Sequence, residues 1–387
     1  MPIIMMLQAF YVVNNTSDTF ARNMIVAVST RTLPGTCPEG YSYFIRETFR
    51  RITSDHPQHQ FIFITDPLLK KDLSTGPNIK TIISGPQNKH PLLWKLWYDI
   101  KLPAILKRNK AAICIAAGGA CTLNTKLPQI LFVYDLSPPG RFYKKELARF
   151  LQKADPVVAF SAFSRATIVS RFDVDAKKIV VVNGAPHAIS QPLDPLEKEK
   201  IKQQYSNGKE FFLYAGTIDP AKNLMNLLKA FSVFKKRQQS GMKLVLAGDI
   251  SRNYRSFIND LKTYKYRDDV LMIENVPATE MARLMGAAYA LICPSAPESL
   301  ATALLDAMRC GVPVIALRGS LAEEITKGAA LYSEGDDHIA IADAMMRLYK
   351  DETLRKELIQ KGSAAINGYS WDKTAEQLWH IILKAIG

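Results

Sequence analysis

The 387-residue chain lacks an apolar run long enough to cross a bilayer. Its longest uncharged apolar stretch is residues 1–13, whereas a membrane-spanning helix needs about 20 residues. The same stretch has no basic start and no small-residue cleavage site, so it does not resemble a signal peptide. We expect residues 1–22 to be an N-terminal extension ahead of the first strand.

Cysteine is scarce and scattered, with five residues that form neither a Cys-x-x-Cys pair nor a cluster with histidine. This pattern argues against a zinc site and against a disulfide scaffold. Internal repeats and low-complexity tracts are also absent. We therefore predict a cytoplasmic protein with reduced, buried thiols.

Acidic residues are scarce in the first half of the chain. Residues 1–192 hold 24 Lys and Arg against 12 Asp and Glu, whereas residues 193–387 hold 26 against 24. A basic half suits an anionic membrane surface, a phosphorylated substrate or nucleic acid, and it also suits a simply solubilising surface. No helix-turn-helix, zinc-finger or RNP-type motif is present, so we expect no nucleic-acid partner.

Short apolar runs rich in β-branched residues alternate with helical patterns along the chain. Near-continuous apolar runs separated by helices are typical of buried parallel strands with crossover helices. This order predicts an α/β, doubly wound fold. The predicted strands are Ile25–Ser29, Gln60–Thr65, Ala112–Ala116, Gln129–Tyr134, Pro156–Phe160, Ile179–Val182, Phe211–Ala215, Lys243–Ala247, Val270–Ile273, Ala288–Cys293 and Pro313–Leu317.

The strands fall into two Rossmann-like units. Residues 187–208 carry proline and charge without a strand pattern, which indicates a linker leading into a helix. Ligands of such sheets bind outside the carboxyl ends of the strands, so we expect the active site in an interdomain cleft. The predicted divisions are an extension at 1–22, an N-terminal Rossmann-like domain at 23–190, a C-terminal Rossmann-like domain at 191–370 and a terminal helix at 371–387.

A candidate anion site follows the first strand of the second unit. The strand ends at Gly216-Thr217, and a helix with an apolar face begins near Asn223. Lys222 stands at the N-terminal edge of this helix, where free amides and the positive end of the dipole favour an anion. The alternative is a solvated lysine in a βα loop.

A pair of carboxylates marks a second candidate site. After the strand at 288–293 comes a Pro/Ser loop with Glu298, then a helix over about 301–309 that carries Asp306. The two carboxylates can bond sugar hydroxyls, and the amides of residues 299–302 can bind a phosphate. The alternative is that Glu298 is a favourable anion in the first helical turn and Asp306 a surface residue.

Together these segments resemble the retaining GT-B glycosyltransferases of family 4, the glycosyl transferases of group 1. The stretch 216–223 is similar to the family's G-T-x-x-P-R-K-N loop, and 294–315 to its Glu-x7-Glu segment. The first half follows the same order with CPEGYSYF, LFVYDLSP and VVAFSAFSR. The resemblance covers about residues 24–387. The matches in the Glu-x7-Glu segment are Pro294, Ser295, Glu298, Leu305, Ala307, Met308, Cys310, Gly311, Pro313, Val314 and Ile315.

Several positions depart from the family pattern. Asp306 stands for the second glutamate, Ala221 for the loop arginine and Tyr134 for a first-domain histidine. Both glycines of the family's E-G-F-G-L are replaced in residues 298–302. A catalytically degenerate GT-B protein that serves as a binding or scaffold subunit is therefore the alternative to a transferase. Nucleotide-sugar epimerisation and anionic-lipid binding are further alternatives.

The resemblance implies transfer of a sugar from a UDP- or GDP-linked donor to a glycan or lipid-linked acceptor, with retention and without a cofactor or metal. Lys222 would neutralise the diphosphate, Glu298 would bond the donor sugar and Asp306 the ribose. Tyr134 would contact the transferred sugar. The implied donor-binding residues are Gly216, Thr217, Asn275, Val276, Ser299, Leu300, Ala301 and Thr302, and those facing them from the first domain are Gly40, Tyr41, Tyr134 and Asp135.

Two segments are amphipathic and basic. Residues 90–110 are aromatic and basic, as a membrane-surface helix is, but we expect their apolar face to pack in the core, with membrane contact as the alternative. Residues 141–155 have a basic face that suits either solvent or an acceptor or lipid. The basic first half of the chain favours a peripheral position on the cytoplasmic face of a membrane.

Overall fold

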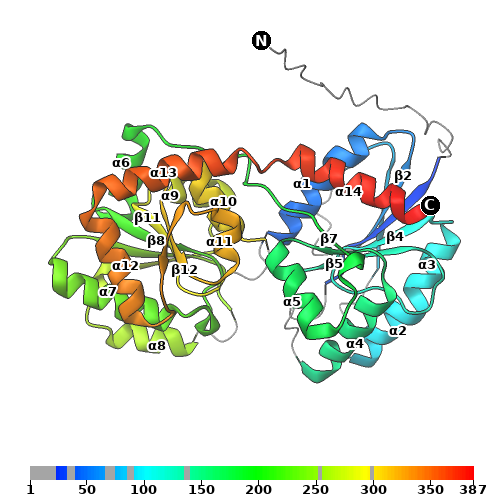
Figure 1. Cartoon of the computed structure of the whole chain (residues 1–387), viewed down its shortest axis with the longest axis horizontal. Helices are drawn as coiled ribbons and strands as arrows, with labels where there is room; N and C mark the ends of the chain where they lie inside the picture. Colours follow the sequence, from blue (N-terminus) through cyan, green and yellow to red (C-terminus); the bar gives the residue numbers. More distant parts are fainter. Residues whose placement is uncertain are drawn as a thin grey trace, which may run out of the picture.

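The computed structural model describes residues 23–32, 40–65, 75–84, 91–134, 140–251, 255–296 and 300–387. These residues form two separate β-sheets that lie side by side (Figure 1). The first sheet has seven strands in the order β3-β2-β1-β4-β5-β6-β7, and the second has six in the order β10-β9-β8-β11-β12-β13. The strand pairings are parallel. The predicted α/β class with two doubly wound units is confirmed.

The first sheet contains the six strands predicted from the sequence and one further strand, β3, at its edge. The edge strand β3 was not predicted, because its residues are mostly half-buried or exposed and give no continuous apolar run. The strands are β1 (Ile25–Ser29), β2 (Gln60–Thr65), β3 (Ile79–Ile83), β4 (Ile113–Ala116), β5 (Gln129–Val133), β6 (Val157–Ala159) and β7 (Ile179–Val181). The helical segments are α1 (Tyr41–Asp55), α2 (Pro91–Leu96), η2 (Trp97–Lys101), α3 (Leu102–Arg108), α4 (Gly140–Lys153), α5 (Ala162–Phe172) and η3 (Ala176–Lys178).

The second sheet also ends in an unpredicted edge strand, β13. Its strands are β8 (Phe211–Ala215), β9 (Lys243–Gly248), β10 (Val270–Glu274), β11 (Ala290–Cys293), β12 (Val314–Leu317) and β13 (Ala330–Ser333). Its helical segments are α6 (Pro195–Ser206), η4 (Pro220–Lys222), α7 (Leu224–Gln238), α8 (Arg255–Thr263), η5 (Arg267–Asp269), α9 (Ala278–Ala287), α10 (Thr302–Arg309), α11 (Leu321–Thr326), α12 (His338–Lys350) and α13 (Glu352–Ile366).

Helices cover both faces of each sheet because the strands are apolar on both faces. In β1, Val26 and Val28 belong to the apolar cluster under α1, whereas Ala27 belongs to the cluster on the opposite face. Successive strand residues point to opposite sides of a sheet, so a continuous apolar run feeds two cores. The second sheet is likewise enclosed between two clusters.

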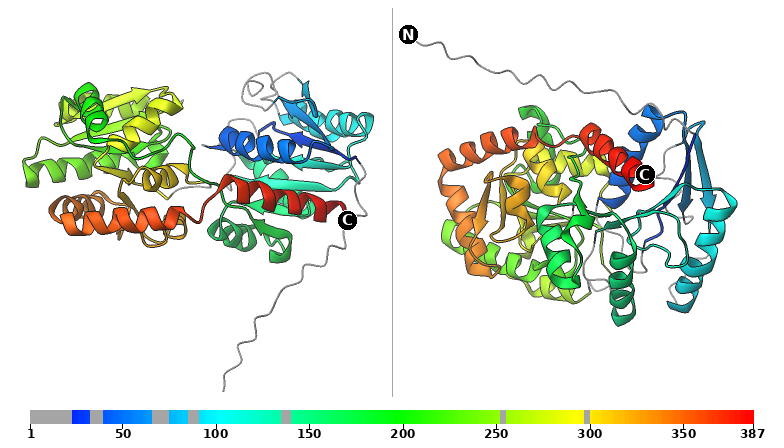
Figure 2. Two further views of the ribbon diagram at one scale, coloured as in Figure 1. Left: turned by 90° about the horizontal axis from the view of Figure 1, so that it is seen from above. Right: turned by 45° about the vertical axis from the view of Figure 1, so that its right-hand side comes forward.

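The chain passes between the two sheets twice. The first passage is the linker between β7 and α6, and the second leads from α13 into α14 (Trp371–Ile386). Helix α14 packs beside α1, and its Trp371, Leu378 and Ile382 lie in the core of the first sheet (Figures 1 and 2). The domain divisions drawn from the sequence stay predictions.

The basic helical segment at 91–108 has two faces. Trp94, Trp97 and Leu102 are buried in the first sheet's core, which confirms the packing interpretation for that face. On the other face the exposed fractions of Leu96 and Ile100 are 52% and 61%. The segment thus anchors itself by its aromatic side and leaves an aliphatic stripe in solvent.

The cysteines in the described part of the chain are free. Cys114, Cys121 and Cys310 are buried, which confirms the prediction for these three. Burial raises the pKa of the Cys114 and Cys310 thiols to about 12, so both remain protonated. No helix of the described residues is long and apolar enough to cross a membrane.

Candidate functional site

The carboxyl ends of β8 and β9 approach each other closely at two glycines. The amide of Gly216 donates to the carbonyl of Ala247 at 3.0 Å. A Cβ atom added to Gly248 would lie 2.0 Å from the oxygen of Gly216, and φ of Gly248 is 151°. No other residue fits there, because the backbones themselves are in contact. Gly216 and Thr217 therefore lie at the carboxyl edge of the second sheet, where ligands of such sheets bind.

The loop that carries Lys222 is held by the side chains around it. The carboxylate of Asp219 accepts from the amide of Ala221 at 2.8 Å and begins the turn η4, which ends at Lys222. Asn223 follows with φ of 59°, a left-handed conformation that asparagine tolerates. Its Nδ2 donates to the carbonyl of Pro294 at 2.8 Å, directly after β11. The two loops that the sequence singled out are thus bonded to each other.

Helix α10 begins at this same edge. Ala301 precedes it with φ of 48°, and alanine has no side-chain acceptor to cap the helix. The first amides and the dipole of a helix without a capping side chain attract an anion. Ala301 and Thr302 therefore stand where an incoming phosphate would meet the helix, whereas Glu298 and Ser299 lie outside the described residues.

The loop before α10 contacts the first sheet's unit directly. The side chain of Leu300 is 3% exposed and belongs to the same apolar cluster as Phe44 and Trp371. A Cβ atom added to Gly40 would lie 2.9 Å from Cγ2 of Thr302. The structure thus brings the predicted first-domain residue Gly40 against the predicted donor-binding residues Leu300 and Thr302.

Asp306 faces the linker between the two units. Its residue is 9% exposed, and Oδ1 accepts from the backbone amide of His187 at 2.7 Å. Oδ2 lies 2.6 Å from Nδ1 of the same histidine. The alternative that Asp306 is a surface residue is therefore wrong, and its predicted contact with a ribose stays a prediction. His187 was not singled out from the sequence, where it only opens the predicted linker.

The two predicted tyrosines lie in the core of the first sheet. The hydroxyl of Tyr41 donates to the carbonyl of Thr30 at 2.9 Å, and its ring meets Tyr134 edge-on at 4.9 Å. Tyr134 stacks on Phe160 at 4.3 Å and is 4% exposed. Burial raises the pKa of Tyr134 well above its usual value. Within the described part of the chain, its buried hydroxyl has no hydrogen-bond partner. Asp135 lies outside the described residues.

The residues predicted to contact the base lie at the far edge of the second sheet. Asn275 follows the edge strand β10 with φ of 52°, and Val276 comes next at the same carboxyl edge. Asn275 is exposed and Val276 is half-buried. The strand that they follow, β10, is separated by β9 from β8, the strand that precedes Lys222.

A second contact between the units was missed from the sequence. Glu324 of α11 accepts from the amides of Ala162 and Phe163 at 2.7 and 2.8 Å, at the first turn of α5. A carboxylate at this end of a helix satisfies orphan amides and the dipole. Glu324 and its two partners are 162 and 161 positions apart, so no local pattern announces the contact.

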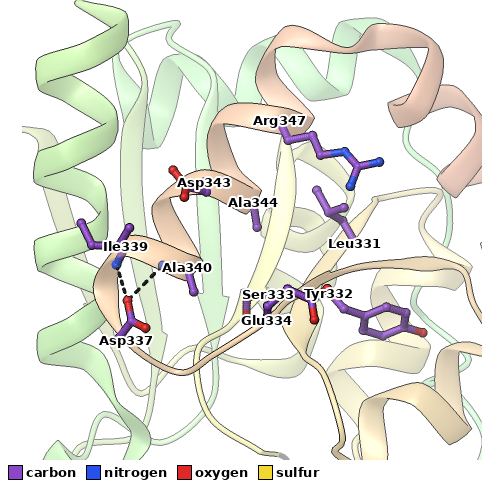
Figure 3. A pocket seen from close by; sticks show the side chains of 10 residues that line it. All are labelled: Leu331, Tyr332, Ser333, Glu334, Asp337, Ile339, Ala340, Asp343, Ala344 and Arg347. Atoms are coloured by element: carbon purple, nitrogen blue, oxygen red, sulfur yellow. Dashed lines mark hydrogen bonds between the residues drawn. The ribbon is translucent and has the colours of Figure 1, made fainter.

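A cavity in the second unit lies apart from these residues. A cavity of about 380 Å³ lies between β13 and α12, lined among others by Glu334, Asp337 and Arg347 (Figure 3). Asp337 there caps α12 by accepting from the amides of Ile339 and Ala340. None of the predicted site residues lines this cavity. No group of three His, Cys, Asp or Glu suited to a metal occurs in the described ranges.

The chain has relatives among known proteins. Residues 196–365 match the family described as glycosyl transferases group 1. This match covers somewhat less than half of the chain. The chain is 28% identical over 243 residues to the O-antigen chain mannosyltransferase B of Escherichia coli, an alignment that covers 61% of this chain and 62% of that enzyme. The match thus spans less than two thirds of the mannosyltransferase.

Solved structures share the fold. A glycosyltransferase from Rickettsia africae superposes with a TM-score of 0.75 at 18% identity and covers 94% of this chain and 99% of its own. Anabaena HepE, solved in complex with UDP-glucose, gives 0.72 at 14% identity with 94% and 100% covered. The fold is GT-B. The region that matches the group 1 family model runs from α6 to α13 and contains Lys222, Glu298 and Asp306.

Proposed function

We propose that the protein is a metal-independent, retaining glycosyltransferase that moves a hexose from a UDP- or GDP-linked donor to a glycan or lipid-linked acceptor. The observation that carries this proposal is the bond from Asn223 to the carbonyl of Pro294 at 2.8 Å. It holds the loop of Lys222 beside the loop that leads into α10. A lysine and the N-terminus of a helix thus stand on two loops that are bonded to each other, an arrangement that suits a diphosphate.

The chemistry follows from these charges. The bond between the anomeric carbon and the diphosphate oxygen breaks while a glycosidic bond forms to an acceptor hydroxyl, whose proton passes to the departing diphosphate. Lys222 and the first amides of α10 stabilise the negative charge that grows on the leaving group. Stabilisation of developing charge in a preorganised site is usually the largest catalytic contribution. Glu298 bonds the donor sugar in this proposal.

The hydroxyl of Tyr134 supports a sugar on the first-domain side. It is buried without a hydrogen-bond partner in the described part of the chain. An unsatisfied buried hydroxyl costs about 1–3 kcal/mol, so a sugar hydroxyl at this place would recover that energy. Tyr134 is thus the first-domain residue that we assign to the transferred sugar.

The acceptor side is proposed to rest on an anionic membrane surface. Leu96 and Ile100 form an exposed aliphatic stripe on the helical segment at 91–108. Such a stripe beside basic residues suits the interface of an anionic bilayer. The charged residues of the segment 91–110 are Lys95, Lys101, Lys107, Arg108 and Lys110, against Asp99.

Nucleotide release tests the transfer proposal. The wild type and three variants are each incubated with GDP-mannose, UDP-glucose and related donors. The variants are Lys222→Ala, Glu298→Ala and the control Lys229→Ala, which changes an exposed lysine farther along α7. We expect release from one donor, a loss of about 100-fold in the first two variants and no change in the control. Release that is equal in all four proteins would contradict the assigned roles.

The scaffold alternative rests on the substituted motif positions. It predicts no release from any donor, with or without membrane extract as acceptor source. If no nucleotide raises the melting temperature either, the transferase proposal is wrong and the scaffold alternative stands.

Vesicle sedimentation tests the membrane surface. The double variant Leu96→Asn with Ile100→Asn removes the two aliphatic side chains that would enter the membrane interface. We expect it to bind anionic vesicles at least about tenfold more weakly than wild type. The control is Leu196→Asn, an exposed leucine on α6 of the other unit. Equal binding of all proteins, or equal binding to neutral vesicles, would contradict this surface.

A further inference from the structure

The carboxylate of Asp306 is held by one residue with two donors. The backbone amide of His187 reaches Oδ1 at 2.7 Å, and the ring nitrogen Nδ1 reaches Oδ2 at 2.6 Å. An ionised carboxylate can accept hydrogen bonds but cannot donate them, so in a contact with ionised Asp306 the proton is on Nδ1. The two bonds fix both the position and the rotation of the carboxylate on α10.

His187 is itself fixed from the first domain. The ring of Tyr43, on α1, lies 3.9 Å from the histidine ring, and the Tyr43 hydroxyl accepts from the amide of Ala188 at 3.0 Å. The indole of Trp371 donates to the carbonyl of Pro186 at 2.8 Å. The linker is therefore bonded on both sides of His187 to elements that pack on the first sheet.

A carboxylate has about four acceptor positions, and His187 uses two of them. Asp306 can therefore keep this contact while it accepts hydroxyl groups of a ligand. Its direction toward that ligand depends on the linker, and the linker depends on the first domain. We propose that His187 is a positioning residue for the donor site: it orients the Asp306 carboxylate and couples its direction to the placement of the two domains.

The aspartate side chain has the length that this contact requires. The two bonds at 2.7 and 2.6 Å leave no space for a further methylene between α10 and the linker unless one of them breaks. Asp306→Glu, which restores the family's residue, separates two explanations. If the carboxylate only binds the donor, glutamate serves as well or better. If His187 orients it, glutamate is worse than aspartate.

This inference rests on the proposed transferase, and its test has two stages. First, wild type is assayed for nucleotide release from the donor panel and for binding of GDP, UDP and ADP by calorimetry. Second, kcat and KM for the donor are measured for His187→Ala, His187→Asn and Asp306→Glu. His380→Ala is the control, because this histidine is exposed on α14 and lies outside the linker. Thermal melting confirms that each variant is folded.

We expect His187→Ala to lower kcat/KM about 10- to 100-fold, as misplaced groups in a reacting geometry do. Asparagine places its Nδ2 near the position of the histidine Nδ1, so His187→Asn recovers most of the loss. A merely structural histidine would not give this recovery in kcat at an unchanged melting temperature. We expect the kcat/KM of Asp306→Glu to be below that of wild type and the kcat/KM of the control His380→Ala to equal that of wild type.

Any one of three results overturns the inference. These are a kcat/KM of His187→Ala equal to that of wild type, a kcat/KM of His187→Asn no higher than that of His187→Ala, and a kcat/KM of Asp306→Glu at or above that of wild type. If wild type turns over a donor and one of these holds, only the role of His187 is wrong. If wild type neither releases nor binds any nucleotide, the proposed function is wrong as well, and the inference falls with it.

Discussion

Replacement of Leu300 by alanine gives the sharpest test of how the two units meet. The leucine comes from the second unit but lies 3% exposed in the core of the first. Its Cδ1 and Cδ2 lie 3.5 and 3.3 Å from where Cβ atoms on Gly40 and Gly184 would be. Two glycines thus leave the space that the leucine fills.

The expected loss follows from the carbons removed. Leu300→Ala removes three, each worth about 0.8 kcal/mol when buried. The glycines cannot reach into the space left behind, so a cavity contribution is added. We expect the free energy of unfolding to fall by about 3 kcal/mol, within the range of buried leucine truncations.

Guanidinium unfolding measures this loss. The matched control is Leu196→Ala, because Leu196 is 76% exposed and its truncation should change stability by less than about 0.5 kcal/mol. A midpoint of Leu300→Ala that coincides with that of the control would refute the packing of Leu300 between the units.

Three further predictions concern the first domain. Gly40→Ala, at φ of 75° and against Thr302, should lower the free energy of unfolding by at least about 1 kcal/mol in guanidinium titrations, and an unchanged midpoint would contradict the contact. Tyr134→Phe should leave the melting temperature unchanged or raise it while nucleotide release falls, since it removes an unpartnered buried hydroxyl; unchanged release would exclude a sugar contact. Burial lowers the pKa of His56 and His59, so the unfolded state binds protons first and stability should decline as the pH falls below about 6.5. The guanidinium midpoint should therefore fall between pH 7.5 and pH 5.5 in wild type and stay level in the double variant His56→Gln with His59→Gln. An equal fall of the midpoint in both proteins would contradict the assignment of this pH dependence to the two histidines.

The sequence predicted those parts of the fold that local pattern determines. Buried central strands such as β1 and β9 are continuous apolar runs, and the structure has them within a residue or two of the expected bounds. The missed strands, β3 and β13, are the edges of their sheets. Most residues of β3 are half-buried or exposed, so its composition resembles that of a loop. Strand β13 is buried but has only four residues, Ala330–Ser333, which is too short a run to stand out from the sequence.

The site was predictable only within the second unit. Lys222 and Asn223 were placed correctly at a strand end, because a βα loop is a local feature. The contacts of His187 with Asp306 and of Glu324 with α5 join residues 119 and 162 positions apart. Their partners are chosen by the packing of one domain on the other, which no pattern in a single segment records.

Two of the positions that depart from the family pattern, Leu300 and Asp306, also join the two units or hold the linker between them. Leu300 fills the gap between Gly40 and Gly184, and Asp306 holds the linker through His187. A degenerating active site would lose contacts at such positions, because nothing would maintain them. Here Leu300 and Asp306 are both buried, the first packed in the core of the first sheet and the second hydrogen-bonded to the linker. These two substitutions therefore fit the proposed donor site better than they fit the scaffold alternative.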